Sequence, residues 1–177
     1  MNNDKKILIE KFFNKALFNH QNNKLKLAII FYKEVLKVNP IHYAAYNNLG
    51  AAYQKLGLFQ KAKDCYKKLN EIDPNDASVC SKLGVLFKYL NDYNNGIKFL
   101  VKAIEINPNY SIAHNNLGNI FYEIKDFKKA KIYYQKAIEI DPNYTVAHNN
   151  LGLIFTQLQE IENAKNCYEK AIQINPK

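Results

Sequence analysis

Four histidines and three cysteines are the side chains of this sequence best suited to metal binding or nucleophilic catalysis. His114 and His148 stand one repeat apart, but no Cys or carboxylate accompanies them at the spacing of zinc ligands. The sequence contains no Gly-rich phosphate loop, no H-E-x-x-H and no C-x-x-C motif, and no three residues suggest a nucleophile with its base. We therefore predict a non-enzymatic protein without a metal or cofactor, in which the cysteines are small packing residues.

Asparagine is the residue type that points to a binding surface. At intervals of 34 residues one position reads Asn14, Asn48, Lys82, Asn116 and Asn150, and the position before it reads Phe13, Asn47, Ser81, Asn115 and Asn149. Asn is a poor helix former because its side chain competes for backbone hydrogen bonds. An Asn amide both donates and accepts, so it matches one peptide unit of an extended partner, at roughly 1 kcal/mol per bond. We predict a column of amides that grips a partner's backbone; the alternative is codon bias toward Asn.

Other polar and apolar side chains are expected beside that column. Three lysines make the middle of the surface basic, Tyr122 is able to stack on a partner side chain, and small apolar contacts come from Val85, Ile112, Val146 and Leu153. The full set of predicted peptide-binding residues is Asn14, Asn47, Asn48, Lys55, Lys82, Lys88, Asn115, Asn116, Asn119, Tyr122, Asn149 and Asn150. A partner segment that is extended and neutral or mildly acidic fits this character.

A 34-residue period sets the elements that must position these residues. The five prolines are Pro40, Pro74, Pro108, Pro142 and Pro176, each 34 residues from the next. Four later prolines share the phase of the first by chance with odds of roughly one in a million. The repeats are 9–42, 43–76, 77–110, 111–144 and 145–177, preceded by an N-terminal extension over 1–8. With no linker between them, we expect a single domain over 1–177.

Each repeat shows the pattern of two helices. In repeat 43–76, apolar and small residues recur at helical spacing from Tyr46 to Leu56 and again from Phe59 to Leu69, with a break near Gly57. Asp92 and Asp126 begin the second helix of their repeats and are expected to be N-caps. Because one hairpin cannot bury its apolar face alone, neighbouring hairpins must stack. The fold class predicted is all-α.

Segment 113–144, AHNNLGNIFYEIKDFKKAKIYYQKAIEIDPNY, resembles the tetratricopeptide repeat (TPR), and the likeness covers 169 of the 177 residues. Leu-Gly, an aromatic residue, Ala, Tyr, Ala and Pro stand at the family's positions. Departures are His114 and His148 where the family often has Trp, Lys15-Ala16 in place of Leu-Gly, and Gly96 in place of Ala, which is expected to weaken its helix by up to about 1 kcal/mol. The resemblance implies a right-handed α–α superhelix, a TPR solenoid, whose concave face binds extended peptides.

Two groups within the family share parts of the asparagine column. The repeats are most similar to the TPR arms of protein O-linked glycosyltransferases and to related bacterial-type TPR proteins, so one alternative is a substrate-holding arm of a larger transferase. Chaperone-binding TPR modules, which clamp a terminal carboxylate, match at Asn14, Asn48 and Lys82, but Glu10 and Ser78 stand where that group has lysines. The main prediction is a protein–protein interaction scaffold that binds a peptide in its concave groove.

Charge and hydropathy limit the partners further. Twenty-five basic residues against sixteen acidic ones give a net charge of +9, yet every basic residue is Lys, whereas phosphate-binding surfaces usually use Arg. Nucleic-acid binding is therefore not favoured. No stretch approaches the roughly 18 apolar residues of a membrane helix, so a cytoplasmic protein is expected. Ile161, Tyr168 and Ile172 on the last helix are expected to be bare, which favours either a longer native chain or end-to-end self-association.

Overall fold

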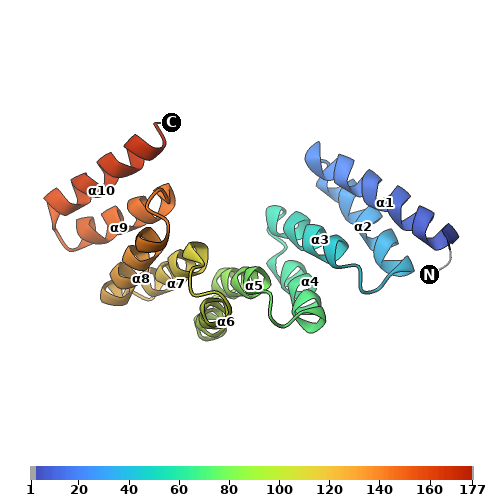
Figure 1. The fold of residues 1–177 in the computed structure, drawn as a ribbon, viewed down its shortest axis with the longest axis horizontal. Helices are drawn as coiled ribbons and strands as arrows, with labels where there is room; N and C mark the ends of the chain where they lie inside the picture. The colour runs from blue at the N-terminus through green and yellow to red at the C-terminus, as the bar shows by residue number, and fades with distance from the viewer. Residues whose placement is uncertain (1–2, 177) are drawn as a thin grey trace. The chain divides into compact units, whose positions relative to one another are not determined.

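The computed structural model describes residues 3–176, which form ten α-helices and, within that range, no strand (Figure 1). The residues expected in the extension are helical from Asn3 onward, as part of the first helix. In chain order the helices are α1 (Asn3–Gln21), α2 (Leu25–Val38), α3 (Tyr43–Lys55), α4 (Phe59–Ile72), α5 (Ala77–Tyr89), α6 (Tyr93–Ile106), α7 (Ser111–Glu123), α8 (Phe127–Ile140), α9 (Thr145–Gln157) and α10 (Ile161–Ile174).

Each expected repeat forms one helix–turn–helix pair, in which the first helix packs along the second. The pairs are α1 with α2, α3 with α4, α5 with α6, α7 with α8, and α9 with α10. Over the described residues the structure therefore confirms the all-α architecture of five repeats that defines this fold class.

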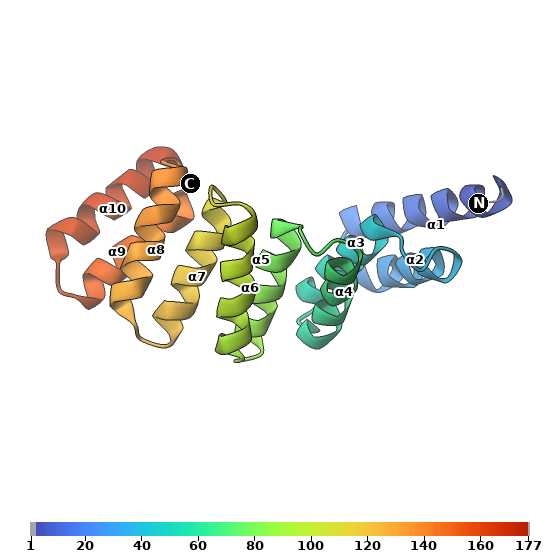
Figure 2. The same ribbon diagram turned by 60° about the horizontal axis from the view of Figure 1, so that its bottom comes forward.

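The helices group into two compact units that divide between Asn75 and Asp76. Unit 1 holds α1 to α4, where α2 packs against α3. Unit 2 holds α5 to α10, where α6 packs against α7, α8 packs against α9, and the first helices α5, α7 and α9 contact one another in sequence (Figure 2). The single domain expected over 1–177 stays a prediction.

The turn inside every repeat places one residue in the left-handed region of the backbone. Gly57 has a φ of 71°, which confirms the predicted break, and four further residues have φ values of 56–62°: Asn23, Asn91, Lys125 and Gln159. This conformation reverses the chain after the first helix, and it suits Gly or Asn best. For Lys125 and Gln159 it costs roughly 1–2 kcal/mol.

The second helices differ in how their N-termini are capped. The Asp92 side chain accepts a hydrogen bond from the backbone N–H of Asn95 at 3.2 Å, and Asp126 accepts one from Lys129 at 3.1 Å, so both predicted N-caps are confirmed. Lys24 occupies the same place in α2 with a similar backbone conformation and provides no side-chain cap.

Glycine at one position of the first helix lets the second helix approach closely. A Cβ at Gly50 would lie 2.8 Å from Cζ of Tyr66, and one at Gly152 would lie 2.6 Å from Cε1 of Tyr168. Real Cβ atoms do not approach aromatic carbons this closely, so the tyrosine rings require the absence of a side chain.

Gly96 makes room of the same kind between repeats. A Cβ there would lie 2.7 Å from Cδ1 of Ile120 on α7 and 3.2 Å from the carbonyl oxygen of Gly84. Despite its glycine, α6 is helical from Tyr93 to Ile106. The expected weakening of α6 by Gly96 stays a prediction. The absence of a side chain at Gly96 lets Ile120 of α7 pack close to the α6 backbone.

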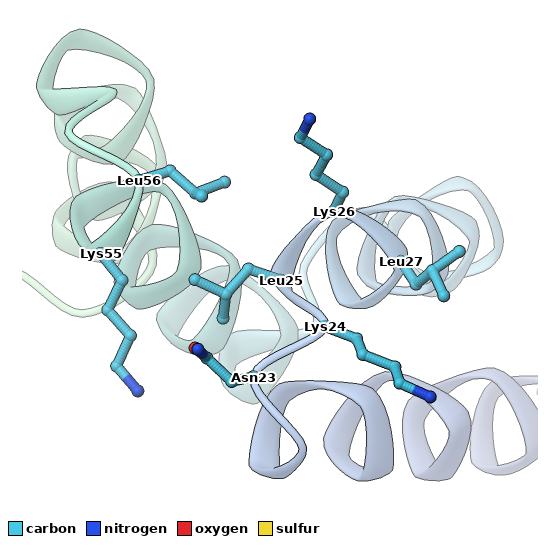
Figure 3. Close-up of a pocket in the computed structure, with 7 residues that line it drawn as sticks. All are labelled: Asn23, Lys24, Leu25, Lys26, Leu27, Lys55 and Leu56. Carbon is cyan, nitrogen blue, oxygen red and sulfur yellow. The ribbon is translucent and has the colours of Figure 1, made fainter.

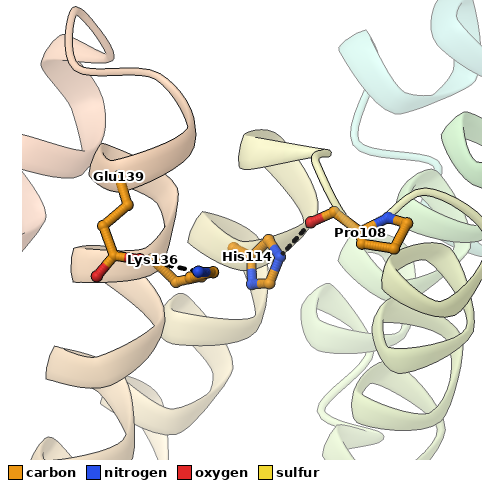
Figure 4. A network of polar contacts seen from close by, with 4 residues as sticks. All are labelled: Pro108, His114, Lys136 and Glu139. Carbon is orange, nitrogen blue, oxygen red and sulfur yellow. Dashed lines mark hydrogen bonds and ion pairs between the residues drawn. The ribbon is translucent and has the colours of Figure 1, made fainter.

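The two buried histidines hold the ends of the preceding repeats. His114 Nε2 donates to the carbonyl oxygen of Pro108 at 3.0 Å (Figure 4), and His148 does the same to Pro142 at 3.0 Å. The ion pair drawn nearby in Figure 4, Lys136–Glu139, lies along α8. Both imidazoles thus fill packing positions, and no group of three or more His, Cys, Asp or Glu within residues 3–176 is placed to hold a metal ion.

The remaining candidate features of the sequence are also packing features. Cys65 and Cys80 are buried and Cys167 is half-buried, and all three are free thiols. Burial, followed by the nearby Asp64 carboxylate, raises the pKa of Cys65 to about 12, which keeps its thiol protonated.

None of the helices described has both the length and the apolar character needed to span a bilayer.

Candidate functional site

A network of amides runs across the first helices of unit 2. Asn116 Nδ2 on α7 donates to Ser81 Oγ on α5 at 3.3 Å. Asn150 Nδ2 on α9 donates to Asn115 Oδ1 at 2.9 Å and to Asn119 Oδ1 at 3.1 Å, both on α7. The two asparagines of the predicted column that lie in unit 2, Asn116 and Asn150, therefore each hydrogen-bond to the first helix of the preceding repeat.

The network changes what the column is able to offer a partner. Asn115 is only 2 % exposed, so its side chain has little surface to offer a partner, and its peptide-binding role stays a prediction. It lies at the seam between α7 and α9, where its oxygen is an acceptor for Asn150. The amide nitrogens of Asn116 and Asn150 are likewise engaged between repeats. The Oδ1 atoms of these two half-buried residues accept no hydrogen bond from the described residues, and they are not among the buried unsatisfied atoms.

Tyr134 supports this network from the second helix. Its hydroxyl donates to Asn119 Oδ1 at 2.9 Å, and the ring lies over Gly118, where a Cβ would be 2.6 Å from Cε1. Burial raises the pKa of the Tyr134 hydroxyl, so it remains a donor throughout the neutral range. Asn119 thereby accepts from both Tyr134 and Asn150, which fixes its oxygen in place.

A hollow of about 280 Å³ opens beside the network. Its polar wall is formed by the amides and by Tyr134, and its apolar wall by two aliphatic side chains of α9. The complete lining is Lys88, Asn119, Tyr122, Glu123, Tyr134, Val146, Asn150 and Leu153. Four of the twelve predicted peptide-binding residues, namely Lys88, Asn119, Tyr122 and Asn150, are brought together here.

Charged and aromatic groups at this hollow are partly held by neighbours. Lys88 Nζ lies 4.9 Å from the ring centroid of Tyr89, and Tyr122 packs on Phe127 with ring centroids 5.6 Å apart. Lys82, outside the hollow, is half-buried; desolvation lowers its pKa, and the nearby Asp76 carboxylate opposes that effect. One basic residue, Lys88, and one acidic residue, Glu123, line this hollow.

The other predicted residues lie elsewhere. Asn149 is exposed on α9, and Asn14 is exposed on α1, whereas Asn47 and Asn48 are half-buried on α3. Lys55 lines a different hollow, in unit 1. The peptide-binding role assigned to these five residues stays a prediction.

Two lining residues were missed by sequence reasoning. From sequence, Tyr134 is expected only to pack, because its position belongs to the apolar stripe of the second helix. The signal that could have found it is Gly118, because a glycine one helix away lets the ring cross and brings the hydroxyl to the first helices. Glu123 carries no such signal, since it stands at the end of α7 among exposed residues.

Family models match the chain over almost its whole length. Tetratricopeptide repeat models match residues 43–76, 111–144 and 145–177, and a second model of the same description matches 12–42 and 77–110. The chain therefore belongs to the tetratricopeptide repeat family. Among curated proteins, no sequence matches it significantly.

Solved structures show the same fold. The MamA protein, known from a crystal structure, is 25 % identical in sequence with a TM-score of 0.79, and the match covers 96 % of this chain and 92 % of the MamA chain. YrrB, described as a TPR protein with an unusual peptide-binding site, is 24 % identical with a TM-score of 0.68 over 93 % of this chain and 85 % of its own. TTC0263 of Thermus thermophilus is 19 % identical with a TM-score of 0.79, and the match covers 96 % of this chain and 92 % of the TTC0263 chain.

Proposed function

We propose that the first-helix face of unit 2 binds an extended segment of a partner protein and that the chain is a non-catalytic scaffold. The observation that carries this proposal is the hollow lined by Asn119, Asn150 and Tyr134, with an apolar wall of Val146 and Leu153. A small number of fixed polar groups beside an apolar wall is the usual composition of a binding site. The likeness to YrrB, a TPR protein with an unusual peptide-binding site, agrees with this role.

The hydrogen bonds of the amides define what the partner must supply. Asn150 Nδ2 donates two hydrogen bonds within the protein, which uses both of its N–H groups, so the group that Asn150 has left for a ligand is its Oδ1 acceptor. Asn116 Nδ2 donates one, so Asn116 has its Oδ1 acceptor and one N–H left. A peptide backbone in an extended conformation presents N–H donors at regular intervals, and each such bond contributes roughly 1 kcal/mol. The face therefore offers mainly acceptors to backbone N–H groups, and the hollow receives one side chain of moderate size.

Two alternatives from the sequence remain as proposals of lower rank. A substrate-holding arm of a larger transferase would use the same face, and only a catalytic domain outside these residues distinguishes it. A carboxylate clamp is disfavoured because Glu10 and Ser78 stand where such a clamp has lysines. A cytoplasmic location likewise stays a prediction.

Removal of the outward acceptors tests the scaffold proposal. An array of extended twelve-residue peptides, varied in sequence, is probed with the wild-type chain and with the double variant Asn116→Ala/Asn150→Ala. The expected result is a loss of about tenfold or more in affinity for every captured peptide, since two hydrogen bonds are removed. Asn149→Ala is the matched control, because this exposed asparagine neighbours Asn150 on α9. Equal capture by the double variant and the control would contradict the proposal.

Exposed apolar residues favour a second role, which is association between copies of the chain. Ile161 and Ile172 on α10 are 64 % and 62 % exposed, and Phe18 on α1 is 62 % exposed. The residues equivalent to Phe18 in repeats 4 and 5, Ile120 and Ile154, are fully buried against the preceding repeat. Phe18 of one copy and the α10 face of another thus offer the two halves of an internal repeat junction.

Sedimentation velocity over a range of concentrations tests this second role. Wild type is expected to form assemblies that grow with concentration, and Phe18→Glu is expected to stay monomeric. Ile132→Glu, at a 60 % exposed apolar position on α8, is the control. A wild-type chain that is monomeric at all concentrations would refute self-association.

A further inference from the structure

A second hollow, of about 660 Å³, lies in unit 1 at the turn end of the first two repeats (Figure 3). Leu25 and Leu27 at the start of α2 and Leu56 just after α3 give it an apolar surface. Leu25 is nearly buried, whereas Leu27 and Leu56 are 47 % and 37 % exposed. The hollow therefore exposes leucine side chains that no element of unit 1 covers.

Only positive charge surrounds these leucines. Lys24, Lys26 and Lys55 line the hollow, and no acidic residue does. Between Glu10 and Asp64 the sequence has a single acidic residue, Glu34, which is paired with Lys37 on the surface of α2. Unit 1 as a whole carries 13 lysines and 6 acidic residues, and 13 − 6 gives +7 of the total charge of +9.

The pKa of the His20 imidazole is lowered in part by the same positive charge. His20, at the end of α1, has its pKa lowered first by burial and then by the charge of Lys55. The direction of the His20 pKa shift therefore agrees with a cationic edge at Lys55.

The corresponding turns of unit 2 have the opposite charge at one position. Where repeat 1 has Lys24, repeats 3, 4 and 5 have the acidic residues Asp92, Asp126 and Glu160. Asp92 and Asp126 cap their helices, whereas Lys24 leaves α2 without a side-chain cap. Among the five repeats, Lys at this position is therefore specific to repeat 1, although repeat 4 also has lysines nearby at Lys125 and Lys128.

The arrangement of the ammonium groups indicates the kind of ligand. In Figure 3 the side chains of Lys24, Lys26 and Lys55 extend in three different directions around the leucines. Groups that diverge in this way do not converge on one compact anion such as a phosphate, but they are able to meet several separate carboxylates. Since Lys is a flexible point charge, it tolerates such spaced partners.

We propose that this hollow of unit 1 is a docking site for an acidic polypeptide segment that inserts leucine-like side chains between Leu25, Leu27 and Leu56 and places carboxylates against Lys24, Lys26 and Lys55. The site is separate from the amide face of unit 2 and does not depend on the function proposed for that face. A nucleic acid is the disfavoured occupant, because the lining contains no Arg for bidentate phosphate contacts and no aromatic ring for base stacking.

The direct test compares three fluorescein-labelled probes by fluorescence anisotropy on the full chain. The first is a twelve-residue peptide of Glu-Glu-Leu triplets, the second has Ser in place of Leu, and the third is a single-stranded oligothymidylate of matched charge. We expect the leucine peptide to bind about tenfold or more tightly than the serine peptide and the oligothymidylate, because only it buries apolar surface. Its affinity is expected to fall as salt rises.

Lys24→Asp is the decisive variant. It reverses one charge at the hollow and installs the residue type that caps α6 and α8 with a similar backbone conformation, so its melting temperature is expected to be no lower than that of wild type. Its affinity for the leucine peptide is expected to fall about tenfold. Lys67→Glu, at an exposed position of α4 with the same change in net charge, is expected to retain wild-type affinity within about twofold.

Leu27→Gln supplies a second variant at the leucine of the hollow that is most exposed, at 47 %. It is expected to reduce the affinity for the leucine peptide to that for the serine peptide. Either equal binding of all three probes by wild type, or unchanged leucine-peptide binding by both Lys24→Asp and Leu27→Gln, would overturn the proposal.

Discussion

The ring of Tyr134 lies directly against Gly118, so that a Cβ on residue 118 would be 2.6 Å from Cε1 and 2.7 Å from Cδ1 of the ring. This approach carries the Tyr134 hydroxyl from α8 to Asn119 on α7, where it donates at 2.9 Å. The packing of the two helices and the polar network of the candidate site are therefore coupled through a single glycine.

Gly118→Ala is expected to destabilise unit 2 by about 1–3 kcal/mol, despite the better helix propensity of alanine. The added methyl group collides with two ring carbons in the interior of the α7–α8 pair, and the ring must shift. Urea denaturation of wild type, Gly118→Ala, Tyr134→Ala and the double variant measures the effect. The double variant should show a coupling between the two changes, since the methyl has room once the ring is gone. Additive free energies would contradict the proposed contact.

Tyr134→Phe tests the hydroxyl without disturbing the ring. It leaves Asn119 Oδ1 with the single donor Asn150, and we expect a loss of about 1 kcal/mol in the free energy of unfolding. Affinity for peptides captured by the first-helix face should also fall, because Asn119 is less firmly held. Tyr133→Phe is the matched control: its ring stacks on Phe121 with centroids 5.4 Å apart, and that contact survives the change.

The helices and turns could be predicted from the sequence, whereas the hydrogen-bond partners of the side chains could not. A 34-residue period in residues of strong local preference predicts the five hairpins, the reversal at Gly57 and the caps at Asp92 and Asp126, because each of these depends on neighbours within one or two turns of helix. The pairing of Asn150 with Asn115 depends instead on how closely two helices approach across a repeat boundary. No local pattern reports that distance.

The two units show why a column of identical residues does not behave identically. In unit 2, Asn150 reaches the amide of Asn115. In unit 1, the residue that stands to Asn48 as Asn115 stands to Asn150 is Phe13. Phe13 has no side-chain acceptor, and its ring packs on the imidazole of His42 with ring centroids 5.0 Å apart. The sequence column therefore predicts which residues share a face, whereas their hydrogen bonds depend on the chemistry of the preceding repeat.

Unit 1 is expected to lose stability at alkaline pH. Burial raises the pKa of both Tyr32 and Tyr66 from 10.0 to about 12, so the folded chain keeps two phenol protons that the unfolded chain releases. Their contribution is complete below about pH 10 and is lost as the pH rises through about 12. Urea midpoints measured between these pH values should fall for wild type and fall less steeply for Tyr32→Phe. Tyr89→Phe, at a 48 % exposed position, should leave the slope unchanged.

Lys125→Gly is expected to stabilise unit 2, even though glycine usually weakens structure. Lys125 has a φ of 62° at the turn between α7 and α8, where repeat 2 has Gly57 with a φ of 71°. Relief of the left-handed strain contributes about 1–2 kcal/mol, and the greater entropy of glycine in the unfolded chain offsets up to about 1 kcal/mol of it. A net gain of about 0–2 kcal/mol should appear as a higher urea midpoint.

The reciprocal change provides the control for that prediction. Gly57→Ala meets no atom within 4 Å, so any loss of stability comes from the backbone conformation alone. We expect a loss of about 1 kcal/mol, measured in the same denaturation experiment. Because the two substitutions exchange a side chain at equivalent turns in opposite directions, changes of the same sign would show that left-handed strain is not what distinguishes these turns.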